Sequence, residues 1–447
     1  MPAPASVTPQ SWRLLAIFVG TIVGLMVQPL PVGAMVLLGV VATALTGALP
    51  PAQALAGYAD PLVWMVVAAF QLARGMIKTG LGRRIALLLI RTIGHTSLGL
   101  GYSLVASDMV LGMIIPSNSA RAGGIVFPIA KSVAETYESR PGPTAGRLGA
   151  FLMLLVYHCD VIVCAMFLTG QASNVLIAGF ARQTAGIELS YSTWALGAIV
   201  PGLVSILLVP LLLYRTCPPT ISRTPAAAEF AAAELARLGA MARGEKLMLL
   251  VFGLVTVLWA TKALHGIDYP IVALVAMLAL LLSGVLTWED VLGERAAWDV
   301  FIWYGGIYQM ARALGDTGIT TWLAGVAGAF TAGWPWGVAL AVLLFVYFYV
   351  HYAFASITAH ASAMFIPFLV VLLAAGTPPY LAVLSLAYLS NLTASLTHYG
   401  TTTSPIYFGA GYVGQGTWWR VGLMVSVVNI VIWVTVGFAW WRLLGWW

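Results

Sequence analysis

Long apolar stretches recur along the whole chain and limit its possible folds more than any other feature. Hydrophobic residues make up 61% of the 447 positions and charged residues 8%, against about 25% charged in an average soluble domain. A water-soluble globule could not bury so many apolar side chains, because its surface grows too quickly relative to its volume. Lipid must therefore contact most of the exterior.

The apolar stretches predict helices. A membrane-spanning barrel would alternate apolar and polar residues over about 10 positions, whereas these stretches are continuous. Helices remain, because each backbone amide at membrane depth must be paired within its own segment. Spans of roughly 17–25 residues are expected near 14–30, 32–49, 62–77, 194–213, 247–264, 271–286, 300–314 and 418–444.

Four further apolar regions are not simple spans. Regions 148–181 and 380–412 each contain one span with a polar, Gly-rich break. Regions 98–133 and 338–373 are too long for one span, and each turns on a Ser-bearing tip, which predicts two re-entrant hairpins. The expected fold is an all-α polytopic membrane protein of about ten spans plus two hairpins.

Charge distribution predicts orientation in the membrane. The net charge of +6 is carried by basic residues in short connections between spans, which is not typical of nucleic-acid binding. If the spans alternate, most of these connections lie on one side, which should be the cytoplasm. Both termini would then face outward, and the N-terminal run lacks the pattern of a removable signal peptide. The hydrophilic segment 217–246 should form a connecting amphipathic helix on the cytoplasmic side.

The sequence contains an internal repeat. Gln71 and Arg74 recur as Gln309 and Arg312, 238 positions later. The tip motif 117–120 recurs at 356–359, and the break glycines at 170 and 179 recur at 400 and 409. Five spans per half would invert the second copy, which is typical of secondary transporters. We expect a first repeat at 1–216, the connecting helix at 217–246 and a second repeat at 247–447.

The two hairpin tips are candidates for binding an anion. Hydroxyl and amide groups at Ser117, Asn118 and Ser119 can donate hydrogen bonds to carboxylate oxygens, and a following helix adds free amides and its positive end. The second tip offers Ser356 and Thr358 in equivalent places. The alternative is that these residues only cap helices.

One basic residue follows each tip: Arg121 in the first hairpin and His360, 239 positions later, in the second. An arginine at membrane depth costs about 2.5–3.5 kcal/mol on insertion scales, so it suggests a function. We expect both residues to offset the charge of a bound anion. The alternatives are that Arg121 reaches the membrane surface and that His360 is a packing residue.

The helix breaks supply further polar candidates, because unwound backbone at membrane depth is tolerated where it is buried in protein or faces a wet cavity. These candidates are Thr169, Gly170, Gln171 and Asn174 in the first break and Gly400, Thr401, Thr402 and Thr403 in the second. A kink satisfied by nearby hydroxyls is the alternative. His158 and Asp160 give weak evidence for a proton relay, and no hydrolase elbow, zinc spacing or phosphate loop is present.

These motifs resemble those of the divalent anion/sodium symporter family, and within it the citrate/succinate, tartrate/succinate and 2-oxoglutarate/malate exchangers. The resemblance rests on SNSARAGGIVFPI at 117–129, HYAFASITAH at 351–360, TGQASN at 169–174 and YGTTTSPIYFGAGYV at 399–413. It covers nearly the whole chain, except that the usual first span before Trp12 is missing.

The resemblance implies that the Ser, Asn and Thr residues of both tips hold substrate carboxylates. It also implies a homodimer in which the hairpin-bearing domain moves like an elevator. Sodium-coupled members bind sodium beside each tip, which here would leave a weak site at Ser117, Asn118 and Gly170. At the second tip Ile357 replaces the Asn, and an aliphatic group cannot bind a cation that prefers oxygen. Arg121 and His360 match the exchanger pattern, so we expect no cofactor and no sodium coupling.

The function expected is exchange of di- or tricarboxylates across the cytoplasmic (inner) membrane. Sodium- or proton-coupled symport of the same anions is the alternative mechanism. A membrane-embedded enzyme is the alternative from another class, and the lack of an acid–base or metal constellation argues against it.

Overall fold

The computed structural model describes residues 3–4, 6–331 and 333–447. Within this part the chain is helical and forms no strand; one isolated β-bridge joins Thr96 and Arg223. Seven of the described helices are long and apolar enough to cross a membrane, and two shorter apolar helices accompany them. The prediction of an all-α polytopic membrane protein is confirmed.

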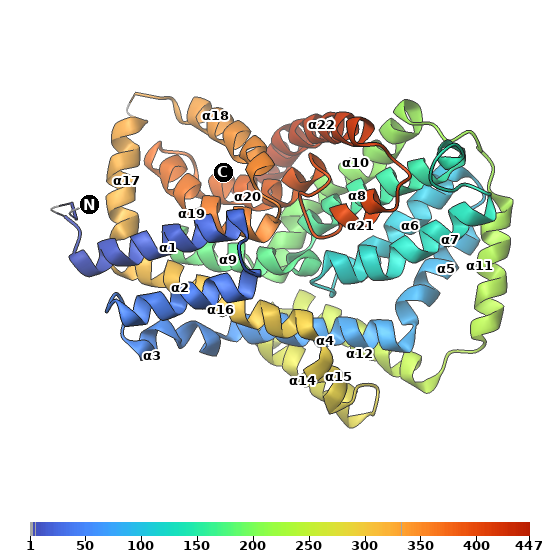
Figure 1. Ribbon diagram of the computed structural model, residues 1–447, viewed down its shortest axis with the longest axis horizontal. Coiled ribbons are helices and arrows are strands. Elements are labelled where there is room, and N and C mark those ends of the chain that lie inside the picture. The colour runs from blue at the N-terminus through green and yellow to red at the C-terminus, as the bar shows by residue number, and fades with distance from the viewer. Residues whose placement is uncertain (1–2, 5, 332) are drawn as a thin grey trace.

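The helices form two layers along the long axis of the molecule (Figure 1). One layer, here called the supporting layer, lies in the lower half of the view. It is built around pairs such as α4 with α14 and α2 with α16. Its helices are α1 (Pro9–Val27), α2 (Val32–Leu45), α3 (Pro51–Ala54), α4 (Pro61–Thr79), α12 (Arg243–Ala260), α14 (Tyr269–Leu282), α15 (Trp288–Gly293) and α16 (Arg295–Asp316).

The other layer, here called the site layer, contains both hairpins and both helix breaks. Its helices are α6 (Ser97–Gly112), α7 (Phe127–Thr136), α8 (Gly149–Met166), α9 (Ala172–Ala185), α10 (Tyr191–Thr216), α18 (Trp336–Tyr349), α19 (Ile357–Ala374), α20 (Pro379–Leu392), α21 (Ser404–Gly409), α22 (Gln415–Ile432) and α23 (Phe438–Leu443). Helix α8 packs against α6, α7, α10 and α20 and is buried along almost its whole length. A helix buried on all sides, as α8 is, forms the core of its layer.

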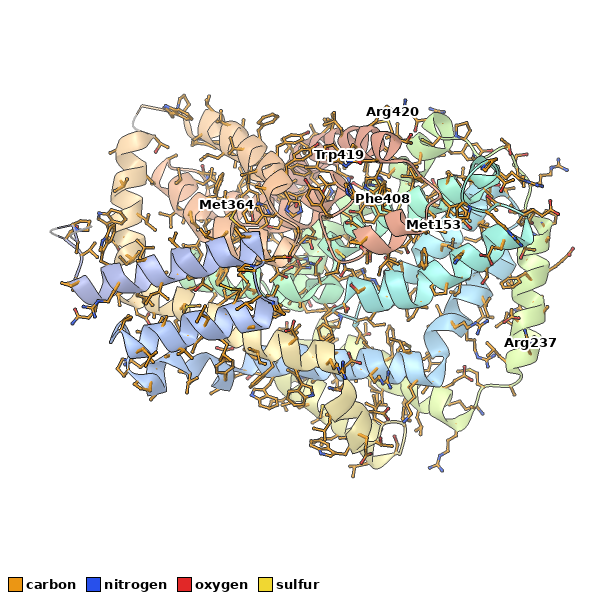
Figure 2. All side chains as sticks on the ribbon, in the orientation of Figure 1. Met153, Arg237, Met364, Phe408, Trp419 and Arg420 are labelled. Atoms are coloured by element: carbon orange, nitrogen blue, oxygen red, sulfur yellow. The ribbon has the colours of Figure 1, made fainter. Side chains whose placement is uncertain are left out.

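Three helices connect the layers: α5 (Leu81–Ile93), α11 (Pro225–Leu238) and α17 (Ile319–Phe330). Helices α11 and α17 stand at opposite ends of the molecule, steeply inclined to the others (Figure 1). The segment predicted to join the two halves contains α11, which packs on α5 and α7. Its outer side carries Arg237, labelled in Figure 2, which is ion-paired with Glu234 on the same helix.

An ion pair fixes the connection after α11. Arg84 on α5 donates from Nε to Glu245 Oε1 at 2.7 Å and from Nη2 to Glu245 Oε2 at 3.0 Å. Arg84 Nη1 also donates to the carbonyl of Gly239 at 3.0 Å. The Arg84 guanidinium lowers the pKa of the Glu245 carboxyl, because the hydrogen bonds favour its charged form. The start of α12 is therefore held against α5.

The supporting layer exposes an apolar stripe. On α14 the exposed side chains are Ile271, Val275, Leu278 and Leu282, at the spacing of one helix face. Such a stripe is unfavourable in water and suits contact with lipid chains or with another apolar surface.

Both predicted hairpins and both predicted breaks form. The first hairpin consists of α6, a tip, the π-helix η2 (Ser119–Val126) and α7; the second consists of α18, the 3₁₀ turn η5 (Val350–Ala353), a tip and α19. The first break separates α8 from α9, and the second separates α20 from α21. The proposed repeat boundaries at 216 and 247 stay a prediction.

Candidate functional site

The first hairpin tip is shaped by short local hydrogen bonds. Ser117 Oγ accepts from the amide of Ala120 at 3.2 Å, and Asn118 Oδ1 accepts from the amide of Ser119 at 3.0 Å. These bonds satisfy amides at the start of η2, as N-cap side chains do. Asn118 is buried, whereas Ser117 and Ser119 are partly exposed. The tip thus caps its helix and still presents hydroxyl groups.

The first break is tied to this tip. Thr169 Oγ1 donates to the carbonyl of Met113 at 2.7 Å. Asn174 Nδ2 donates to the carbonyls of Cys164 and Phe167, at 2.7 and 2.9 Å, which satisfies acceptors left free where α8 ends. Thr169 and Asn174 therefore hold the broken backbone in place. Gln171 is buried, and its Oε1 has no hydrogen-bond partner within the described part of the chain.

The second break meets the first tip. Asn118 Nδ2 donates to Thr401 Oγ1 at 3.0 Å, and Thr402 Oγ1 donates to Asn118 Oδ1 at 3.1 Å. Ser119 Oγ donates to Thr402 Oγ1 at 2.6 Å. Four residues predicted separately from distant parts of the sequence are thus in direct contact. They form a polar row of amide and hydroxyl groups, from which Ser119 and Thr402 are still accessible to solvent.

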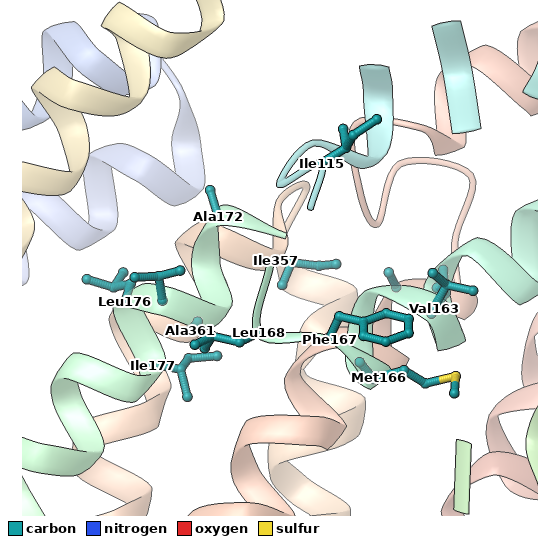
Figure 3. Packing of buried hydrophobic residues seen from close by; sticks show 14 of the residues in the cluster. Ile115, Val163, Met166, Phe167, Leu168, Ala172, Leu176, Ile177, Ile357 and Ala361 are labelled. Carbon is teal, nitrogen blue, oxygen red and sulfur yellow. The ribbon is translucent and has the colours of Figure 1, made fainter. Parts of the chain in front are cut away.

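The second tip has a different partner. Ser356 Oγ accepts from the amide of Ala359 at 3.4 Å and so caps α19, and Ser356 and Thr358 are both partly exposed. Ile357, between them, is buried in the apolar cluster that contains Leu168 of the first break and Ile115 of the first tip (Figure 3). The first tip therefore contacts the break of the other half through polar groups, whereas the buried residue of the second tip is an apolar side chain.

Arg121 is fully buried, and its five N–H groups all have acceptors. Nε donates to Asp108 at 2.6 Å, and Nη2 donates to Asp160 at 2.7 Å and to Cys164 Sγ at 3.3 Å. Nη1 donates to the carbonyls of Ile115 at 3.1 Å and Gly170 at 2.9 Å.

This geometry changes the role expected for Arg121. It retains no donor for a bound anion, it is paired with Asp108 and Asp160, and it does not reach the surface. The Gly170 carbonyl, expected in a weak sodium site with Ser117 and Asn118, accepts from Arg121 instead. A cation there would face a guanidinium charge at close range, which is unfavourable.

Asp108 was not singled out from the sequence, although an acid in an apolar span calls for a partner. Asp160 was considered only with His158, but the two side chains diverge. Asp160 turns to Arg121, and its Oδ2 also accepts from Thr403 Oγ1 at 3.3 Å. The His158 ring packs beside Tyr157 and Trp418. Asp108, Arg121 and Asp160 are called the charged cluster below.

The equivalent place in the second half contains Tyr347, His360 and Ser390, called the hydroxyl cluster below. Tyr347 Oη and Ser390 Oγ are hydrogen-bonded at 2.7 Å, and the His360 ring packs on Tyr347 with centroids 4.5 Å apart. His360 is fully buried, and no ion pair involves it within the described residues. In the part of the chain that the structure describes, no acid is paired with His360 to stabilise a positive charge.

A polar row formed by a re-entrant tip and the break of an interrupted helix, in a helical membrane protein, is typical of secondary transporters. The chain belongs to the sodium:sulfate symporter transmembrane region family, whose model matches residues 1–447. Family and fold thus agree that this is a multi-pass membrane transporter and not an enzyme.

Relatives match along the full chain. A Bacillus subtilis protein named as a candidate malate transporter is 46% identical over 100% of this chain and 94% of its own length. The chloroplastic dicarboxylate transporter 1 of Arabidopsis thaliana is 45% identical over 100% of this chain and 81% of its own. The Escherichia coli inner membrane protein YbhI is 38% identical over 100% and 95%.

A solved structure shares the fold. The crystal structure of the Alcanivorax borkumensis YdaH transporter superposes with a TM-score of 0.59 over 99% of both chains, at 16% sequence identity. At that identity the likeness concerns the fold alone.

Proposed function

We propose that the protein exchanges dicarboxylates, of the malate, succinate or 2-oxoglutarate type, or tricarboxylates such as citrate, across the cytoplasmic membrane. Relatives named as dicarboxylate transporters support the substrate class. The polar row supports it chemically, because hydroxyl and amide groups can donate to carboxylate oxygens without holding them through a permanent charge. An anion bound in this way can also be released.

The observation that carries exchange, in place of sodium symport, is the position of Arg121. Its Nη1 donates to the carbonyl oxygen of Gly170 at 2.9 Å. A cation beside the first tip would need that oxygen as a ligand. At the second tip, Ile357 stands at the position equivalent to Asn118 and offers no amide oxygen. A carrier without cation sites depends on its cargo to complete the polar row, because uncompensated polar groups are costly to move through an apolar environment. The empty carrier then returns slowly, which couples influx to efflux.

The movement we propose is elevator-like. The site layer would carry the polar row across the membrane relative to the supporting layer. Contacts within the site layer, such as Asn118 with Thr401, support its moving as a unit. At the contact between the layers, Gly179 of α9 lies so close to Tyr308 of α16 that an added Cβ would be 2.6 Å from the ring. The small residue on α9 thus allows the two layers to approach closely.

The exchange proposal is tested with purified protein in liposomes. Uptake of labelled malate should require malate or another dicarboxylate inside the vesicles and should be indifferent to a sodium or pH gradient. Uptake into empty vesicles driven by an ion gradient would support symport instead. Thermal stabilisation by citrate, succinate, malate, tartrate and 2-oxoglutarate, with sulfate for comparison, identifies the preferred anion.

A homodimer in the membrane is part of the proposal. The exposed stripe of α14 offers an apolar surface in the supporting layer, away from the layer proposed to move. Single cysteines placed at Val275 and Leu278 should cross-link two copies if this face is the interface. A monomer by mass photometry, with no cross-link, contradicts a dimer through α14.

A further inference from the structure

The charged cluster contains one more acid than base. Asp108 and Asp160 each receive one hydrogen bond from Arg121, and within the described residues neither has a second cationic partner. Both carboxyl groups are almost completely inaccessible, with 1% and 0% of the residue surface exposed. If both were ionised, the cluster would carry a net negative charge in the dry centre of the site layer.

The remaining neighbours do not balance this charge. The titratable groups that face the two acids are Cys159, Cys164 and Tyr157 from α8 and Tyr407 from α21. Tyr407 Oη donates to the carbonyl of Ala122 at 2.8 Å, and Tyr157 Oη is engaged with Ala394 and Ser404. Thr403 gives one neutral hydrogen bond to Asp160. A buried charge without a partner is costly, so an acid in such a place binds a proton.

Arg121 bridges the two carboxyl groups, because its Nε donates to Asp108 at 2.6 Å and its Nη2 donates to Asp160 at 2.7 Å. Asp160 Oδ2 already accepts from Thr403, whereas Asp108 Oδ2 has no partner among the described residues. We infer that Asp108 and Asp160, bridged by Arg121, form a proton-binding site that retains one proton at neutral pH, carried on Asp108. The cluster is then neutral: one guanidinium, one carboxylate and one carboxylic acid.

Provided that the protein carries dicarboxylates as proposed, the retained proton also favours substrate binding. Asp160 is joined to the polar row through a single hydroxyl, because Thr403 Oγ1 donates to Asp160 and lies 3.5 Å from Asn118 Nδ2. An extra negative charge there would repel an arriving dicarboxylate. The bound proton removes that repulsion. Because both acids are buried, the proton stays through the transport cycle and is not a driving ion.

Infrared difference spectroscopy tests the site without requiring transport. A protonated carboxylic acid has a C=O stretch well separated from the bands of carboxylates. The wild-type protein should show this band between about pH 6 and pH 9, and Asp108→Asn should lose it. Asp160→Asn should also lose it, because a single remaining acid would be ionised against Arg121. Asp268→Asn, which alters an exposed acid paired with Lys262, is the matched control and should leave the band unchanged.

The outcomes separate this inference from the proposed function. Absence of the band in wild-type protein, or its persistence in both Asp108→Asn and Asp160→Asn, overturns the inference, whether or not malate is exchanged. If the wild-type protein shows the band but exchanges no malate, the proposed function fails and the proton site stands. Asp108→Asn, which mimics the protonated acid, should exchange malate within about threefold of wild type. A loss above about tenfold in a folded Asp108→Asn protein would contradict a neutral Asp108.

Discussion

The charged cluster and the hydroxyl cluster occupy equivalent places in the two halves and are built from different chemistry. Asp108, Arg121 and Asp160 stand where the second half has Tyr347, His360 and Ser390. The first cluster is held by ion pairs of 2.6 and 2.7 Å, and the second by one hydroxyl pair of 2.7 Å and ring packing. The repeat preserves the position of a basic side chain after each tip and changes everything that accompanies it.

The difference shows how one requirement can be met in two ways. In both halves the carbonyl of the break glycine is satisfied by a basic side chain at 2.9 Å: Gly170 by Arg121 and Gly400 by His351. The first donor carries a full charge and needs two acids around it. The second is an imidazole from the opposite arm of its hairpin and needs none. The stability of the first half should therefore depend on ion pairs, and the stability of the second half on side-chain packing.

Removing the arginine should have the largest effect. Arg121→Met leaves buried carboxyl groups without their cation, which typically costs about 3–5 kcal/mol. We expect little folded protein in detergent, measured by size-exclusion chromatography and thermal unfolding. His360→Gln, the matched change in the hydroxyl cluster, breaks no ion pair and should retain the folded peak. An Arg121→Met protein as stable as wild type would contradict the electrostatic reading of the first half.

Asn118→Ala should have the next largest effect, on transport more than on folding. The change removes all three side-chain hydrogen bonds to the threonines of the second break, and we expect malate exchange to fall by at least about tenfold, equivalent to about 1.4 kcal/mol. Initial rates in proteoliposomes measure it. Ile357→Val, at the equivalent position, should lower stability by about 0.5–1.5 kcal/mol and leave exchange largely intact. Undiminished exchange by Asn118→Ala would remove the first tip from the mechanism.

Tyr347→Phe should have a modest effect. It deletes the Tyr347–Ser390 hydrogen bond, worth about 1 kcal/mol, and Ser390 Oγ still donates to the carbonyl of Leu386 at 2.7 Å. Thermal unfolding should shift slightly, and exchange should persist. A decrease in the free energy of unfolding above about 3 kcal/mol would show that the hydroxyl cluster contributes as much to stability as the charged cluster.

Replacing sodium by choline should have the smallest effect of all. The Arg121 guanidinium at Gly170 and the apolar Ile357 leave neither tip with a complete set of oxygen ligands, so exchange rates at constant ionic strength should not change. An exchange rate that rises with sodium concentration would indicate a cation site and would contradict this interpretation of the two tips.

The sequence was sufficient for much of the architecture. Polar tips inside over-long apolar stretches and Gly-rich interruptions predict hairpins and breaks, and the observed hairpins differ from the predicted 98–133 and 338–373 by only a few residues. These features are local, because membrane depth forces each segment to satisfy its own backbone. Asn118, Ser119, Thr401 and Thr402 were identified for the same reason.

The partners of these residues were not predictable in the same way. Asp108 lies in the first arm of the hairpin and Arg121 follows the tip, so only the turn at the tip brings their side chains together. The contact between Asn118 and Thr401 joins residues 283 positions apart. Repeat symmetry gave no sign that the first tip contacts the second break through Asn118 and the threonines at 401 and 402. Such pairings depend on how the halves dock, which periodicity does not encode.

The contact between the first tip and the threonines at 401–403 also sets an order for assembly in the membrane. Asn118 is synthesised and inserted long before its partners, which lie close to the end of the chain. Until those last segments arrive, the nascent protein contains an amide and an acid pair at membrane depth with incomplete hydrogen bonding. A chain truncated before the second break would keep these groups without their partners, which is costly at membrane depth.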